Sequence, residues 1–121
     1  DYVTVAERFL GVPYLWGGRT ALGFDCSGLV QAALAVSGIA APRDTDMQEG
    51  ALGAPLTFTR ALQGLKRGDL VFWKGHVGIM QDAGRLLHAN AHHMTVASES
   101  LLKAAARIEA AGSPITAIKR F

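Results

Sequence analysis

The residues Phe24-Asp25-Cys26-Ser27-Gly28-Leu29-Val30 place the only cysteine of the 121-residue chain at the start of a predicted helix. Asp25 is a favourable N-cap, and apolar residues then recur at helical spacing until Gly38, a favourable helix stop. The first N–H groups of a helix and its dipole favour a thiolate over a thiol. Because a single cysteine cannot form an internal disulfide, either burial or reactivity explains Cys26.

The composition is that of one domain with little net charge. Half of the residues are apolar, 18% are charged, and the formal net charge is +2. A chain of this length buries its own core, so we expect residues 1–121 to form one domain. No basic cluster with interleaved aromatic residues is present, which argues against nucleic acid as a partner. No apolar run approaches the roughly 20 residues of a membrane-spanning helix, so no membrane span is expected.

The spacing of apolar residues changes from helical in the first half of the chain to alternating in the second. In the first half, a helix is predicted over 3–10, a glycine-rich loop over 13–24, and a helix from 26 to the stop at 38. An irregular segment over 42–62, with a helical turn at 46–51, follows. In the second half, strands are predicted over 69–73, 76–81, 85–90, 95–98 and 115–121, with a helix over 101–108. Helices followed by an antiparallel meander predict an α+β domain.

A thiol nucleophile needs a nearby base, and the base needs an orienting partner. His76 and His88 lie on consecutive predicted strands, joined by the predicted three-residue loop Asp82-Ala83-Gly84, whose glycine is expected to be left-handed. This loop length pairs Gly78 with His88, so the two histidines share one face as diagonal neighbours. We therefore predict Cys26 as nucleophile, His76 as base and later acid, and His88 as the group that orients His76.

Each of these residues also has a purely structural interpretation. A lone cysteine on a helix is more often a small core residue than a nucleophile. The joint occurrence of a capped helix start, a glycine loop before it and two histidines on one face favours catalysis. Cys26, His76 and His88 are zinc ligands by type, but the close paired spacing of structural zinc sites is missing, so no metal is predicted. His92 and His93 are expected in an exposed loop.

Five segments resemble, in order, the motifs of the NlpC/P60 cysteine peptidases. They are Pro13-Tyr14-Leu15-Trp16-Gly17-Gly18, Phe24-Asp25-Cys26-Ser27-Gly28-Leu29-Val30, Gly68-Asp69-Leu70-Val71-Phe72-Trp73, His76-Val77-Gly78-Ile79 and Leu87-His88-Ala89. The resemblance implies a papain-like fold in which N-terminal helices pack on a small antiparallel sheet. It also implies that Cys26, His76 and His88 form a catalytic triad and that no cofactor is needed.

Members of this family cleave peptides of the bacterial cell wall, commonly between D-γ-glutamate and a diamino acid such as meso-diaminopimelate or lysine. The segment Pro42-Arg43-Asp44-Thr45-Asp46-Met47-Gln48 resembles that of members that act on free, recycled wall peptides and release L-Ala-D-γ-Glu. The resemblance implies an oxyanion site made of the Cys26 backbone N–H and the Tyr14 hydroxyl. It also implies a set of substrate-binding residues, some of which receive the free amine of the substrate: Tyr14, Asp25, Ser27, Arg43, Asp44 and Thr45.

The sequence leaves several alternatives open. An N-acetylmuramoyl-L-alanine amidase or an acyltransferase of related fold is one alternative function, and an inactive wall-binding module is another. Related dipeptide-releasing enzymes usually carry SH3-like domains before the catalytic domain, so residues 1–121 are either a catalytic domain removed from such a chain or one that lacks them. A recycling enzyme would be cytoplasmic, whereas a wall hydrolase would be periplasmic or secreted. The diamino acid, free peptide or intact wall as substrate, and the oligomeric state also stay open.

Overall fold

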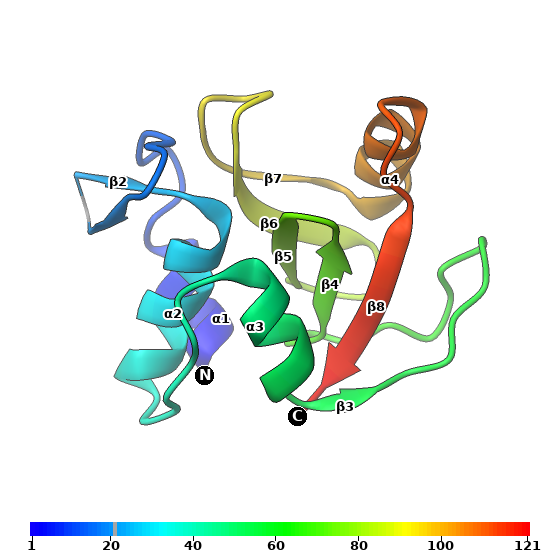
Figure 1. Cartoon of the computed structure of the whole chain (residues 1–121), viewed down its shortest axis with the longest axis horizontal. Coiled ribbons are helices and arrows are strands. Elements are labelled where there is room, and N and C mark those ends of the chain that lie inside the picture. Colours follow the sequence, from blue (N-terminus) through cyan, green and yellow to red (C-terminus); the bar gives the residue numbers. More distant parts are fainter. Residues whose placement is uncertain (21) are drawn as a thin grey trace.

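Helices occupy much of the first half of the chain and strands much of the second in the computed structural model, which describes residues 1–20 and 22–121 (Figure 1). The helices are α1 (Tyr2–Glu7), α2 (Cys26–Val36), α3 (Thr45–Ala51) and α4 (Leu101–Ala110). The strands are β1 (Arg19–Thr20), β2 (Gly23–Phe24), β3 (Ala54–Pro55), β4 (Leu70–Trp73), β5 (His76–Met80), β6 (Arg85–Asn90), β7 (Thr95–Ser100) and β8 (Ile115–Arg120). The predicted α+β class is confirmed.

Six of the strands form one antiparallel sheet in the order β3-β8-β4-β5-β6-β7. Helices α1 and α2 pack on one face of this sheet, and α4 lies on the other side, as Figure 1 shows. Strands β1 and β2 form a separate two-stranded pair within the segment predicted as a loop, and position 21 of that segment lies outside the described residues. None of the helices in the described ranges is long and apolar enough to cross a membrane.

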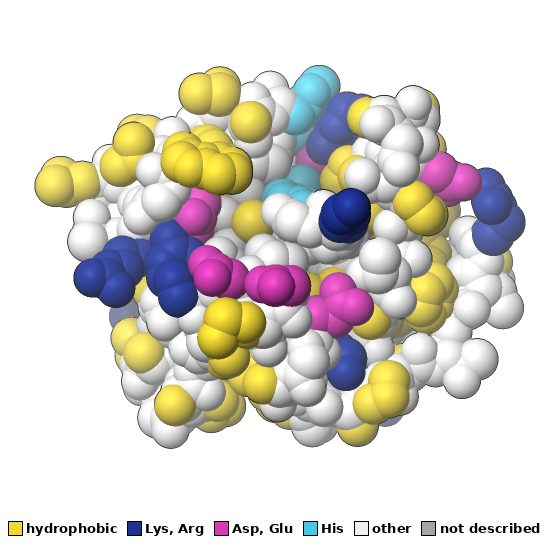
Figure 2. Space-filling view, viewed as in Figure 1, with side chains coloured by type: hydrophobic (Ala, Val, Ile, Leu, Met, Phe, Trp, Pro, Cys, Tyr) yellow, Lys and Arg dark blue, Asp and Glu magenta, His cyan; other side chains and the backbone are white. Residues whose placement is uncertain are grey.

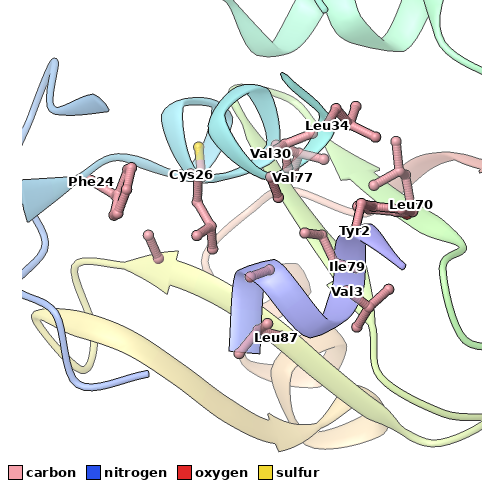
Figure 3. Close-up of a cluster of buried hydrophobic side chains, with 14 of the residues drawn as sticks. Tyr2, Val3, Phe24, Cys26, Val30, Leu34, Leu70, Val77, Ile79 and Leu87 are labelled. Carbon is pink, nitrogen blue, oxygen red and sulfur yellow. The ribbon is translucent and has the colours of Figure 1, made fainter. Parts of the chain in front are cut away.

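The core is divided into two clusters because side chains of a strand alternate between the faces of the sheet. On β4, Leu70 and Phe72 pack toward α1 and α2, whereas Val71 and Trp73 pack toward α4. Figure 3 shows the first cluster, with Cys26 among its labelled members. The nucleophile predicted from the sequence is therefore at the contact between α2 and the sheet.

Helix α2 begins and ends where the sequence predicts. The Asp25 carboxylate accepts a hydrogen bond from the Gly28 backbone N–H at 2.7 Å, which caps the helix. Gly38 follows the helix with φ of +80°, a left-handed conformation that glycine adopts without steric cost. At the other end, a Cβ on Gly28 would collide with the Gly18 carbonyl oxygen, so glycine at this position lets the loop press against the helix start.

The β5–β6 hairpin has the predicted register. Ile79 pairs with Leu87, and the backbone N–H of Gln81 donates to the Arg85 carbonyl at 2.9 Å. Continued along the strands, this register sets residue 78 opposite residue 88. The left-handed conformation expected for Gly84 is wrong, because the Asp82 carboxylate accepts from the N–H groups of residues 84 and 85 and holds the turn in another form.

The two edges of the sheet end differently. Strand β3, at one edge, is only two residues long and contains Pro55. Along β7, at the other edge, a second segment adds three backbone hydrogen bonds. Gly11 N–H donates to Val96 O at 2.9 Å, Val96 N–H to Val12 O at 2.8 Å, and Tyr14 N–H to Met94 O at 2.8 Å. These bonds tie the loop that carries Tyr14 to the start of β7.

Gly78→Ala is expected to lower the free energy of unfolding by about 1–3 kcal/mol, the usual cost of overpacking a core. A Cβ on Gly78 would lie 2.5 Å from Leu86 Cδ1 and 3.2 Å from His88 Cβ. Urea denaturation measures the effect. The matched control is Gly84→Ala on the same hairpin, where a Cβ meets nothing within 4 Å. We expect it to change stability by less than about 0.5 kcal/mol, and equal losses in the two variants would contradict this explanation.

Candidate active site

Cys26 is the first residue of α2 and is 8% exposed. Its Sγ lies 3.7 Å from the Thr45 hydroxyl and 3.8 Å from the Gly75 carbonyl oxygen, and it accepts a hydrogen bond from the Val77 backbone N–H. The sulfur therefore faces the residues on both sides of His76. Among the residues that the structure describes, no hydrogen bond joins the sulfur to the His76 ring itself.

Burial controls the ionisation of the thiol. It raises the pKa of Cys26 above its usual value, and the negative charge of Asp25 adds to this. The hydrogen bonds from Thr45 and from the backbone N–H groups of Val77 and Ser27 lower the pKa, but burial is the largest cause. The helix start therefore does not produce a thiolate at rest, contrary to the expectation from the sequence.

The two histidines predicted from the hairpin register are in direct contact. His76 Nε2 and His88 Nδ1 lie 2.7 Å apart, with the rings at a steep angle to each other. The Trp73 ring lies against His76, with centroids 5.4 Å apart. Since His76 Nε2 is occupied by His88, Nδ1 is the nitrogen of His76 that remains for a reacting group. In Figure 2, histidine atoms, in cyan, are visible in a hollow near the middle of this face and at its upper edge.

Two further residues extend this contact, and the sequence analysis missed both. His88 Nε2 lies 2.7 Å from Glu99 Oε2, and Arg107 binds both oxygens of Glu99 at 2.8 and 2.9 Å. The strand that carries Glu99 was predicted to end at Ser98, one residue too early. Extending the register argument from β6 to β7 would have placed Glu99 diagonally across from His88, whereas nothing in the sequence points to Arg107 on α4.

The protonation of this group follows from its surroundings. Burial lowers the pKa of both His76 and His88, so each imidazole is neutral at neutral pH. The pKa of Glu99 is lowered to about 2, first by the hydrogen bonds from Arg107 and also by those from His88. Glu99 is therefore a carboxylate, paired on one side with a guanidinium and on the other with a neutral imidazole.

The predicted substrate-binding residues are only partly brought together. Arg43 donates to Asp25 Oδ2 and to Ser27 Oγ, both at 2.9 Å. Thr45 contacts the Cys26 sulfur. Arg43 and Thr45, both predicted to bind substrate, therefore contact residues at the start of α2. Asp44, by contrast, is exposed at the start of α3 and makes no side-chain capping bond.

Tyr14 lies on the loop that is tied to β7, and it is half-buried. Its pKa is raised, first by burial and also by the negative charge of Asp25. Among the described residues no hydrogen bond joins its hydroxyl to Cys26, so the oxyanion role of Tyr14 stays a prediction.

One group of potential metal ligands is present in the described part of the chain: His88, His93 and Glu99. It includes neither Cys26 nor His76, which were the alternative zinc ligands by sequence. Both oxygens of Glu99 already bind the Arg107 guanidinium. A positive charge at this distance disfavours a metal cation, so the group fits an ion-pair network better than a metal site.

A cysteine at a helix start, packed against an antiparallel sheet that carries two bonded histidines, is the arrangement of papain-like thiol peptidases. The chain belongs to the NlpC/P60 family, whose family model matches residues 11–107. The gamma-D-glutamyl-L-lysine dipeptidyl-peptidase of Bacillus subtilis (strain 168) is 38% identical over 98 residues, which cover 74% of this chain and 31% of that protein. The name of that relative describes a peptidase.

A second relative and a solved structure support the same family. The bifunctional muramidase/DL-endopeptidase CwlT of Bacillus subtilis (strain 168) is 40% identical over 94 residues, covering 70% of this chain and 27% of that protein. The peptidoglycan hydrolase RipB of Mycobacterium tuberculosis is similar in structure, with a TM-score of 0.79 and 31% identity, covering 98% of this chain and 62% of that chain. The chain spans less than a third of the length of these two curated relatives.

The protein is expected to lose stability as the pH falls below about 6.5. In the folded state the pKa of His76 is lowered from 6.5 to about 3 and that of His88 is also lowered, both mainly by burial. The unfolded chain therefore takes up protons that the folded protein excludes, at up to about 1.4 kcal/mol per pH unit for a histidine. Below pH 4.5, protonation of Glu99 in the unfolded chain adds to the loss. Urea unfolding between pH 7.5 and 4 measures this dependence.

Replacement of one buried imidazole tests whether histidine burial causes this pH dependence of stability. His76→Gln is expected to flatten the pH dependence of the free energy of unfolding between pH 6.5 and 4.5. Glutamine does not titrate, so the unfolded chain takes up one proton fewer in this range. His92→Gln is the matched control, since His92 is exposed and should leave the slope unchanged. A slope that His76→Gln does not alter would show that burial of this ring is not the cause.

Proposed function

We propose that this domain is a cysteine peptidase that hydrolyses the D-γ-glutamyl–diamino acid bond of bacterial cell-wall peptides and releases L-Ala-D-γ-Glu. The observation that carries the proposal is the contact of His76 Nε2 with His88 Nδ1, which leaves His76 Nδ1 for a thiol. The sulfur lies against the backbone on both sides of that histidine. Two relatives with peptidase names, one specific for a γ-D-glutamyl bond, support the choice of bond.

The reaction begins from a neutral pair. Burial raises the pKa of Cys26 and lowers that of His76, so the resting protein holds a thiol and an imidazole. As the sulfur attacks the γ-glutamyl carbonyl carbon, His76 takes the thiol proton as a general base. It then gives this proton to the leaving amine of the diamino acid. Water, activated by His76, hydrolyses the thioester and regenerates the thiol. Hydrogen bonds between such groups often tighten only when substrate is bound.

The developing oxyanion would be stabilised at the start of α2. The Cys26 backbone N–H belongs to the first turn, where N–H groups have no partner within the helix. Tyr14 supplies a hydroxyl from a loop that the Tyr14–Met94 backbone bond ties to the start of β7. Donors held in place before reaction stabilise such charge without reorganisation during the step.

Asp25 is the residue that we propose to bind the free amine of the substrate's first alanine, with Tyr14 and Ser27 beside it. Its carboxylate already caps α2 through Gly28 and pairs with Arg43. The side chain is 16% exposed, so it remains accessible to an ammonium group. A carboxylate has about four acceptor positions, which leaves room for one further charge-assisted hydrogen bond.

Mass spectrometry of digests tests the bond and the substrate together. From free L-Ala-D-γ-Glu-diaminopimelate we expect L-Ala-D-γ-Glu and free diaminopimelate, and much slower release of fragments from intact sacculi. Cys26→Ala should abolish turnover and keep the fold, because only the nucleophile is lost. His88→Ala should lower the rate less than Cys26→Ala, because His88 orients rather than reacts. Retained turnover in Cys26→Ala, or sugar freed from intact peptide as an amidase would produce, would contradict the proposal.

The amine subsite has its own test. N-acetylation of the substrate removes the ammonium charge, and we expect kcat/KM to fall by about tenfold or more, the value of one charge-assisted hydrogen bond. Asp25→Asn should reduce this discrimination while keeping the helix cap, because asparagine caps helices as well as aspartate does. Glu109→Gln is the matched control, since Glu109 is an exposed carboxylate that pairs with Arg60 and lies outside the Arg43 network. Equal discrimination in the wild-type protein and Asp25→Asn would remove Asp25 from the subsite.

A further inference from the structure

Four side chains from three strands and a helix form an unbroken line of contacts. His76 on β5 meets His88 on β6 at 2.7 Å, His88 meets Glu99 on β7 at 2.7 Å, and Glu99 is bound by Arg107 on α4 at 2.8 and 2.9 Å. The His88 side chain is fully buried and that of Glu99 is 13% exposed. The sequence motifs include the two histidines but neither Glu99 nor Arg107.

The line of contacts fixes which nitrogen carries each proton. Glu99 is a carboxylate and can only accept, so the hydrogen lies on His88 Nε2. A neutral imidazole has one donor and one acceptor, so His88 Nδ1 accepts. His76 Nε2 must then be the donor in the bond between the rings. The unprotonated nitrogen of His76 is consequently Nδ1, which is the form that can take a proton from a thiol.

We propose that Glu99, held in place by Arg107, is a positioning residue that sets the tautomers of His88 and His76 so that His76 presents an unprotonated Nδ1 to Cys26. This inference rests on the proposed roles of Cys26 and His76 as nucleophile and base. Arg107 acts on Glu99 rather than on the histidines. By binding both carboxylate oxygens, it prevents Glu99 from rotating away from His88 and keeps the carboxylate charged.

The charged groups around the histidines act in opposite directions. His88 faces His76 from β5, Glu99 from β7, Arg107 from α4 and His93 from the turn after β6. The negative charge of Glu99 raises the pKa of both His76 and His88, whereas Arg107 lowers both. Removal of either charge should therefore shift the pH dependence of catalysis, and the two shifts should have opposite signs.

Steady-state kinetics across pH on the free tripeptide test the proposal. Glu99→Gln should lower kcat about 10- to 100-fold with KM within about twofold, the range typical when an outer partner of a functional histidine is lost. An amide either donates or accepts, so it no longer dictates the tautomer. The bell-shaped profile should move to lower pH in Glu99→Gln and to higher pH in Arg107→Gln. Glu109→Gln, which neutralises an exposed carboxylate paired with Arg60, is the control and should match the wild-type protein.

Alkylation of Cys26 by iodoacetamide at pH 7 separates this inference from the proposed substrate, because it needs no peptide. We expect slower alkylation in Glu99→Gln than in Glu109→Gln. If alkylation is slower in Glu99→Gln but the wild-type protein does not hydrolyse wall peptides, the proposed function is contradicted and this inference stands. Equal alkylation rates and equal pH profiles in Glu99→Gln and the wild-type protein would overturn the inference and leave the proposed function standing. If Glu99→Gln does not fold, Arg107→Gln decides, and a profile that does not move to higher pH overturns the inference.

Discussion

The bond between His76 Nε2 and His88 Nδ1 depends on the register of the β5–β6 hairpin. A slip of one residue would turn every side chain of one strand to the other face and separate the two rings completely. The register is held by the backbone pairs on both sides of the turn and by the small size of Gly78, which leaves room for the side chains opposite it. The order in which the ring nitrogens donate and accept is therefore a consequence of strand pairing.

Burial determines the protonation state of the same residues. The surroundings that make the ring-to-ring bond strong also disfavour charge, so both the thiol and the imidazoles rest in neutral form. Hydrogen bonds near the helix start lower the pKa of Cys26, but they do not overcome the effect of burial. A neutral thiol is oxidised less readily than a thiolate, so the sulfur is protected until substrate reaches it.

Local features of the fold could be predicted from the sequence, whereas features that join distant segments could not. The Asp25 cap, the Gly38 stop and the hairpin register each depend on a few neighbouring residues, and all three are confirmed. The prediction of a left-handed Gly84 was wrong because the Asp82 carboxylate, two residues earlier, determines the shape of the turn.

The missed arginine contacts depend on how helices pack, which local sequence patterns do not reveal. Arg107 reaches Glu99 only because α4 packs across β7, and Arg43 reaches Asp25 only because α3 folds back on α2. Short pairs such as β1 with β2 contain too few residues for an alternating pattern to appear. The proposed nucleophile, its base and the orienting His88 could thus be named from the sequence, whereas the contacts of Arg107 and Arg43 could not.

The edge strands of the sheet affect how readily the protein aggregates at high concentration. Bare strand edges recruit other chains, which is the first step of fibril growth. Here one rim ends in a two-residue strand with a proline, which cannot donate a ladder hydrogen bond, and the start of the other is occupied by the segment before Tyr14. The same backbone bonds that hold the loop carrying Tyr14 therefore also protect the protein against edge-to-edge aggregation.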